Sequence, residues 1–112
     1  MISKALVAAS TKPLVLSILK DGETYGYRII KQMKILSGGK LDWSFGMLYP
    51  VLHRLEKEGF IASKWKQSDK GRLRKYYFLT DAGCQELERE KTQWHTVNDV
   101  FARLWKSSEV RS

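Results

Sequence analysis

The stretch "GMLYPVLHRLEKEGFI", residues 46–61, carries leucines at helical spacing and reaches a glycine before apolar residues resume. Its apolar stripe begins one residue earlier and comprises Phe45, Leu48, Leu52 and Leu55. Residues spaced by three, four and three positions share one face of a helix, and we expect this face to be buried. Ser44 is a suitable N-cap and Gly59 a suitable residue after the C-cap, so the sequence predicts an amphipathic helix between them.

Pro50 conflicts with a helix that begins at Ser44. A proline has no amide hydrogen to donate, so the carbonyl oxygen of Gly46 would lose its partner within the helix. Local rules therefore favour a later start near Tyr49, with Pro50 as the first helical residue, where proline is tolerated. Taken without other information, the residues leave both starts open.

A shorter helix is expected upstream in "TKPLVLSILKDG", residues 11–22, with Thr11 as its cap, Pro13 in its first turn and Gly22 as its end. The apolar run "ALVAA" ahead of it is similar to part of a signal peptide but is too short for one. The sequence also lacks the ~18 uninterrupted apolar residues of a membrane span. We therefore expect a soluble, cytoplasmic protein with no membrane partner.

A second helix is predicted by "TYGYRIIKQMKILSGG", residues 24–39, which closes on two glycines. Its apolar face repeats at offsets of four, four and three residues and comprises Tyr25, Ile29, Met33 and Leu36. Basic and polar residues fill the intervening positions, so we expect one buried and one solvated face.

A basic β-hairpin follows the "GMLYP" helix. The segments "FIASKWKQ" and "RLRKYYFLT" are rich in aromatic and aliphatic residues, and "SDKG" between them favours a turn. Residues 64–75 hold six basic side chains against one acidic side chain, and Lys70, Arg72 and Arg74 lie at or beside the turn. A solvated surface hairpin seldom needs so unequal a charge, which indicates an anionic partner.

The last segment predicts a long helix that begins at "LTDAG", with Thr80 as the cap and Asp81 at the positive end of the helix dipole. Apolar residues recur along it at heptad spacing: Leu87, Trp94, Val97, Phe101 and Leu104. Two partners fit this stripe, the first helix of the same chain and a second copy of the chain. A helix of roughly 25 residues is ~37 Å long, more than a small domain covers, so we expect a homodimer.

Charge is distributed unevenly along the 112 residues. The chain has 20 Lys and Arg against 12 Asp and Glu, for a net charge of +8. Residues 1–80 hold 15 basic and 6 acidic side chains, whereas residues 81–112 hold 5 and 6. A basic excess of this kind suits nucleic acid or a membrane surface.

The sequence does not indicate a catalytic or metal site. It has no paired carboxylates in an apolar setting, no nucleophile elbow and no phosphate loop. The single cysteine, Cys84, excludes an intramolecular disulfide and fits a reducing compartment. Cys84, His53 and His95 lack the spacing of metal ligands. We therefore expect neither an enzyme nor a metal or other cofactor.

The expected order of elements is helix, helix, helix, basic hairpin and long helix, which is the order of a winged helix-turn-helix. The predicted fold class is mainly α with a small β-hairpin. Residues 1–80 would form the DNA-binding region and residues 81–112 the dimerisation helix, in one compact unit. A winged-helix module that binds an acidic protein partner is the alternative, and a salt-dependent shift of duplex DNA separates the two.

Four segments at these separations resemble the PadR family of bacterial transcriptional regulators: "YGYRIIKQM", "GMLYPVLHRLEKEGFI", "RKYYFLT" and "LTDAG". The similarity runs from about residue 12 to residue 104, and the single C-terminal helix resembles the short subfamily. This resemblance implies a homodimeric repressor of a palindromic operator, responsive to a multidrug or phenolic compound. It also implies a recognition helix that begins near Ser44 with Pro50 inside its first turns, and places Trp94 in a pore between protomers where a small aromatic or amphipathic effector would bind. Activation instead of repression fits the same residues.

Ten residues are candidate contacts with double-stranded DNA: Tyr25, Gly26, Ser44, Met47, Tyr49, His53, Arg54, Lys70, Arg72 and Arg74. For Tyr49 the alternative is packing on the wing, and for Arg54 it is an ion pair with Glu58. The ring of Tyr25 lies on an apolar face, which favours core packing, whereas backbone amides at Gly26 can bind phosphate. The cations at the hairpin turn need no precise geometry to attract phosphate.

Overall fold

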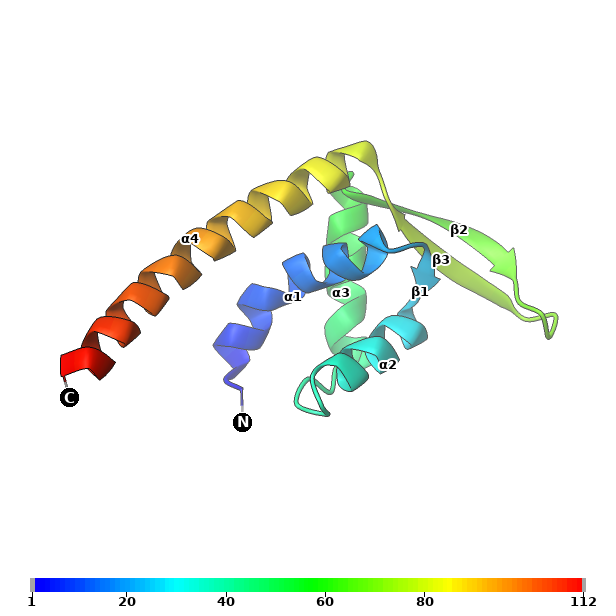
Figure 1. The fold of residues 1–112 in the computed structure, drawn as a ribbon. Coiled ribbons are helices and arrows are strands. Elements are labelled where there is room, and N and C mark those ends of the chain that lie inside the picture. The colour runs from blue at the N-terminus through cyan, green and yellow to red at the C-terminus, as the bar shows by residue number, and fades with distance from the viewer. Residues whose placement is uncertain (1, 112) are drawn as a thin grey trace.

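The computed structural model describes residues 2–111, with side chains for residues 2–106. Its elements are α1 (Lys4–Lys20), β1 (Thr24–Tyr25), α2 (Gly26–Leu36), α3 (Phe45–Lys57), β2 (Ile61–Gln67), β3 (Leu73–Leu79) and α4 (Asp81–Arg111). Figure 1 shows α1, α2 and α3 grouped together, with the hairpin of β2 and β3 extending to one side and α4 to the other. We call this hairpin, residues 61–79, the wing. The chain is thus mainly helical, a winged helix-turn-helix with a long C-terminal helix, as the sequence predicted.

Helix α1 begins earlier than the sequence predicted. Ser3 is its N-cap and accepts a hydrogen bond from the Leu6 amide at 3.2 Å. Thr11, the predicted cap, lies inside the helix and donates its hydroxyl to the Val7 carbonyl at 2.6 Å, so that assignment is wrong. Pro13 removes one helical hydrogen bond, but the alanine-rich segment before it favours helix strongly enough for the helix to continue through the proline.

Helix α3 begins at Phe45, so the later start that local rules favour is wrong. The Ser44 Oγ accepts a hydrogen bond from the Met47 amide at 3.2 Å, which is the predicted cap. Pro50 lies inside the helix and leaves the Gly46 carbonyl without its helical donor. Burial of three leucines of the predicted stripe on the opposite face offsets this missing bond: Leu48, Leu52 and Leu55. Phe45, the first residue of that stripe, is instead 44% exposed.

The sheet has one more strand than the hairpin that the sequence predicted. Its strands lie in the order β1-β3-β2, and both pairs are antiparallel. Strand β1 has only two residues, and its partners are Thr24 with Tyr77 and Tyr25 with Tyr76. The extra strand ties the start of α2 to the base of the wing.

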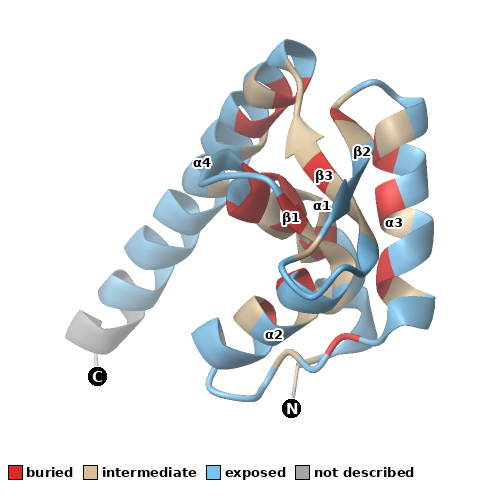
Figure 2. Cartoon of the chain, turned by 90° about the vertical axis from the view of Figure 1, so that its right-hand side faces the viewer, coloured by how far each residue is buried: buried red, intermediate tan, exposed pale blue. Residues whose placement is uncertain are grey.

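The hydrophobic core lies between α1, α2, α3 and the base of the sheet, as the red segments of Figure 2 show. From α4, Leu87 joins this core, and Trp43 enters it from the loop before α3. Leu36, which the sequence placed on the buried face of α2, is instead 74% exposed. It is the last residue of α2, about one turn beyond Met33, the last buried residue of the helix.

Candidate nucleic-acid interface

The N-terminal ends of α2 and α3 and the inner face of the wing enclose a concavity of about 580 Å³. Aromatic and basic side chains make up most of its lining: Tyr25, Tyr27, Phe45, Tyr49, Trp65, Arg72, Arg74, Lys75 and Tyr77. Aromatic rings interleaved with cations are suited to the sugars, bases and phosphates of nucleic acid. This concavity is therefore the candidate site.

One face of α3 is exposed beside this concavity. Its residues recur at helical spacing and are Gly46, Tyr49, Pro50, His53, Arg54 and Lys57. Of the predicted contacts on this helix, Tyr49, His53 and Arg54 lie on this face. Met47 is partly buried and packs against the core, so its side chain does not belong to this face. The sequence analysis did not predict Gly46, Pro50 or Lys57 as part of this face. Pro50 and His53 follow Gly46 by four and seven residues, so helical spacing would have placed these three on one face.

Two of the predicted contacts on α3 have partners within the chain. Ser44 uses an oxygen lone pair for the cap, and its hydroxyl hydrogen stays available for another acceptor. The Arg54 Nε lies 3.8 Å from the Glu58 carboxylate, with both side chains largely exposed. An exposed pair of this kind is worth less than about 1 kcal/mol, so Arg54 can exchange Glu58 for another anion at little cost.

Three aromatic rings line up where α2 meets α3. The rings of Tyr27 and Phe45 stack with centroids 6.4 Å apart, and Phe45 and Tyr49 are tilted with centroids 5.9 Å apart. Gly26 lies beneath this array, and a Cβ at this position would be 3.3 Å from the Phe45 ring. Gly26 therefore allows the two helix starts to approach each other, a packing role that sequence reasoning missed.

The inner face of the wing carries two exposed apolar residues that were not predicted as contacts. Pairing of Trp65 with Lys75 and of Gln67 with Leu73 places these four residues on the face that turns toward α3. Trp65 is 66% exposed and Leu73 is 64% exposed. Alternation along the predicted strands would have placed both on one face, but only the structure shows that this face lines the concavity.

The structure divides the six wing cations into two groups. Glu23, in the loop before β1, binds the ammonium groups of Lys64 at 2.9 Å and Lys66 at 2.5 Å. These two bonds, first that from Lys66, lower the pKa of the Glu23 carboxyl. Lys75 lies 3.7 Å from Glu56, the acidic residue of α3 that points toward the wing. These three cations are at least partly neutralised within the chain.

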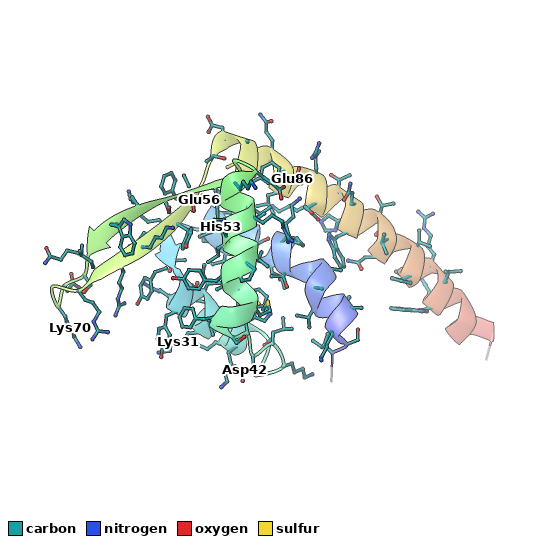
Figure 3. All side chains as sticks on the ribbon, turned by 180° about the vertical axis from the view of Figure 1, so that it is seen from behind. Lys31, Asp42, His53, Glu56, Lys70 and Glu86 are labelled. Carbon is teal, nitrogen blue, oxygen red and sulfur yellow. The ribbon has the colours of Figure 1, made fainter. Side chains whose placement is uncertain are left out.

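The other three cations are the predicted ones, Lys70, Arg72 and Arg74. None of them forms an ion pair with an acidic side chain of residues 2–106. Figure 3 shows Lys70 at the far end of the wing, well away from Glu56 and Glu86. The turn that presents them is closed by a hydrogen bond from the Ser68 amide to the Arg72 carbonyl at 2.7 Å. The free positive charge of the wing is thus concentrated at its tip.

Tyr25 holds one of these cations in place. The Arg74 guanidinium lies over the Tyr25 ring, 4.4 Å from its centroid, and the same ring meets Tyr76 edge-on at 5.3 Å. Tyr25 therefore packs within the chain, as its place on the apolar face favoured, and orients Arg74 at the edge of the concavity. At the floor, burial raises the pKa of the Tyr77 hydroxyl to about 12, so it remains a neutral hydrogen-bonding group at pH 7.

The predicted stripe on α4 divides into a buried and an exposed part. Leu87 is 1% exposed and packs in the core of its own chain, so it has almost no area left for a second copy. Trp94 is partly buried and lines a groove of about 340 Å³ between α1 and α4, together with Pro13, Leu14 and His95. The remaining residues of the stripe are 42–61% exposed: Val97, Phe101 and Leu104.

Other kinds of site receive no support from the part of the chain that the structure describes. Over that part, His, Cys, Asp and Glu side chains form no group of three or more that could hold a metal ion. No described helix combines the length and the apolar character needed to cross a membrane. Cys84 is partly buried, and its Sγ lies 4.0 Å from the Lys20 ammonium.

Comparison with known proteins agrees with this geometry. Residues 15–89 match the family model described as "Transcriptional regulator PadR-like family". The negative transcriptional regulator PadR of Bacillus subtilis is 34% identical over 94 residues, which cover 80% of this chain and 52% of that protein. This chain therefore spans about half the length of that relative.

Solved structures extend the comparison to the fold. A PadR-like transcriptional regulator from Bacillus cereus has a TM-score of 0.81 at 32% identity, covering 90% of this chain and 96% of that one. A transcriptional regulator from Clostridium thermocellum has a TM-score of 0.82 at 27% identity, covering 92% and 97%. The family match includes all of α2, α3 and the wing, and hence the concavity. The chain belongs to the PadR-like family of transcriptional regulators, a family of DNA-binding proteins and not of enzymes.

Proposed function

We propose that this chain is a sequence-specific repressor in which α3 enters the major groove of an operator and the wing lies along the neighbouring phosphates. The observation that carries the proposal is the concavity, which is lined by Tyr49 from the exposed face of α3 and by Arg72 and Arg74 from the wing. Tyr49, His53 and Arg54 would meet base edges or the phosphates beside them. The repressor assignment is supported by the name of the Bacillus subtilis relative, a negative regulator.

The wing supplies two kinds of contact in this proposal. Lys70, Arg72 and Arg74 neutralise phosphates, which gives affinity without sequence preference. Trp65 and Leu73 form an apolar wall opposite α3, which packs on the deoxyribose rings of the strand that passes between α3 and the wing. Affinity from the first group depends on salt, whereas affinity from the second depends on apolar area.

The test of the proposal is the salt dependence of duplex binding. Neutralising Lys70, Arg72 and Arg74 together should weaken binding to operator and random duplex alike, and flatten the slope of log affinity against log salt by roughly one unit for each phosphate that is no longer neutralised. Replacing Lys64 and Lys66 by glutamine is the control, because the two share Glu23 as an ion-pair partner and are partly neutralised by it. Equal slopes for parent and triple variant, or displacement by an acidic protein but not by duplex DNA, would contradict the proposal.

We propose further that residues 81–112 dimerise the chain, and that residues 1–80 form its DNA-binding region. The support is the exposed stripe of Val97, Phe101 and Leu104, to which exposed Val100 and Trp105 add apolar area. A second copy is the partner that fits it, because a twofold pair presents two α3 helices to half-sites ~34 Å apart, one turn of DNA. The operator would then be a palindrome.

We also propose that a planar aromatic or amphipathic effector binds beside Trp94. The groove between α1 and α4 is apolar, and its volume of about 340 Å³ lies within the range of small-molecule sites. Such a ligand releases the operator only if it binds one arrangement of the two α3 helices more tightly than the other. Titration of phenolic acids and planar cations should quench tryptophan emission in the parent protein but not in Trp94→Ala. Equal quenching in both proteins would exclude Trp94 as the platform.

A further inference from the structure

Gly46 is the second residue of α3, and nothing among the described residues explains why it is a glycine. The φ angle of Gly46 is not positive, so any L-residue can adopt its backbone conformation. An added Cβ would meet only the Ser44 Oγ, at 3.8 Å, which is ordinary van der Waals contact. Alanine forms helices better than glycine does. The fold would therefore be more stable with alanine at this position.

The other two helical glycines of the described chain differ from Gly46 in this respect. A Cβ at Gly26 would press on the Phe45 ring at 3.3 Å. A Cβ at Gly83, in the first turn of α4, would lie 1.9 Å from the Phe60 carbonyl oxygen, a distance that no packing allows. Both glycines make room for neighbouring parts of the same chain, whereas the space in front of Gly46 is open.

This open space lies on the exposed face of α3. Gly46 is one turn before Pro50, and His53 follows on the same side. Because Pro50 has no amide hydrogen, the carbonyl oxygen of Gly46 also lacks its helical partner. A missing side chain and a backbone carbonyl that lacks its helical donor therefore occur together at the end of the helix that would lead into the groove.

We infer that Gly46 is the point at which DNA comes closest to α3, and that a side chain here holds the helix away from the groove. The inference rests on the proposed function, since it assumes that α3 meets DNA. It makes Gly46 a positioning residue, which acts by its lack of volume.

The experiment compares stability and DNA affinity in Gly46→Ala. We expect a higher urea midpoint than in the parent protein, together with about tenfold weaker binding to a genomic fragment selected with the parent. Gly46→Leu should weaken binding further, and the order of the three affinities should follow side-chain volume. Ala82→Leu is the matched control, because Ala82 is the exposed second residue of α4 and lies outside the candidate interface.

The outcomes separate the inference from the function on which it rests. If the parent protein binds no duplex, the proposed function is wrong and the inference falls with it. If the parent binds and both Gly46 variants bind equally well, the function stands and the inference is overturned. Weaker binding that comes with a lower urea midpoint also overturns it, because Gly46 would then be needed by the fold, as Gly83 is.

Discussion

Lys12 of α1 and Glu86 of α4 form an ion pair, with 2.5 Å between the ammonium nitrogen and a carboxylate oxygen. The Glu86 carboxylate is nearly buried and also receives Arg89, while Lys12 extends to Glu90 at 3.6 Å and lies over the Phe60 ring. The hydrogen bond from Lys12 lowers the pKa of Glu86. This pair joins the DNA-binding region to the helix that we propose for dimerisation.

The pair makes stability depend on pH at the acidic end. Because the pKa of Glu86 is lower in the folded chain than its usual 4.5, its contribution is present above that value and is lost as pH falls through the folded pKa. Glu86→Gln should lower the free energy of unfolding by about 2 kcal/mol at pH 7. Urea unfolding at pH 7 and in acid should show the difference from the parent shrinking in acid.

Glu88→Gln is the control for this measurement. Glu88 is exposed, and its ion pair is with Lys91 of the same helix at 3.5 Å. Exposed pairs contribute little, so its unfolding curves should match those of the parent at both pH values. If Glu86→Gln and Glu88→Gln behave alike, the pair with Lys12 does not stabilise the fold.

Pro50→Ala should make α3 more stable. The new amide can donate to the Gly46 carbonyl, and alanine is a better helix former than proline, so we expect the free energy of unfolding to rise by about 1 to 3 kcal/mol. Urea unfolding followed by circular dichroism measures the change. An unchanged midpoint would mean that the Gly46 carbonyl already has a partner, such as water, that is as good as the helical bond.

Trp65→Ala should weaken duplex binding without changing its salt dependence. The substitution removes apolar area from the inner face of the wing and no charge, so we expect affinity to fall about tenfold at every salt concentration with the slope retained. Trp65→Phe should restore most of the affinity, because it keeps a flat apolar ring. Fluorescence anisotropy of labelled duplex measures both quantities. A flatter slope in Trp65→Ala would show that Trp65 acts by holding the tip cations in position.

Leu104→Glu should convert the proposed homodimer into a monomer. A carboxylate within the apolar stripe of α4 would be buried without a partner in the dimer, at a cost of several kcal/mol. Thr92→Glu is the control, since Thr92 is exposed on the same helix and lies off the stripe. Sedimentation velocity distinguishes the species. A parent protein that is already a monomer, or a Leu104→Glu variant that remains a dimer, would count against the interface.

The parts of the fold that the sequence predicted are those set by neighbouring residues. The Ser44 cap, the leucine stripe and the glycine after α3 all act within a few positions of one another, and the structure confirms them. The start of α1 could not be predicted locally, because the proline rule favours Thr11. Only the continued helix lets Val7 pack against the core.

The candidate site was less predictable, because its decisive contacts join distant parts of the chain. The sequence located the wing cations but could not show that Glu23 neutralises Lys66 from 43 positions away. Strand β1 was missed because two residues carry too little pattern, and its identity depends on pairing with β3. Trp65 was visible as a strand residue, but which face of the wing would meet α3 depends on how the hairpin packs.

Thr80 alone separates β3 from α4, and this short connection has a mechanical consequence. The Thr80 hydroxyl donates to the Gly59 carbonyl at 2.6 Å, and Gly83 lies directly against Phe60, so the junction leaves little room to flex. The wing and α4 are thus joined rigidly near Gly83, and a rotation of one about this junction rotates the other. Helix α4 has 31 residues and measures ~46 Å, so a shift of ~4 Å at its far end corresponds to a rotation of the wing by ~5°. In the proposed dimer, a change in how two such helices cross would reach the wing through this junction, and Leu87 and the Lys12–Glu86 pair would have to move with it.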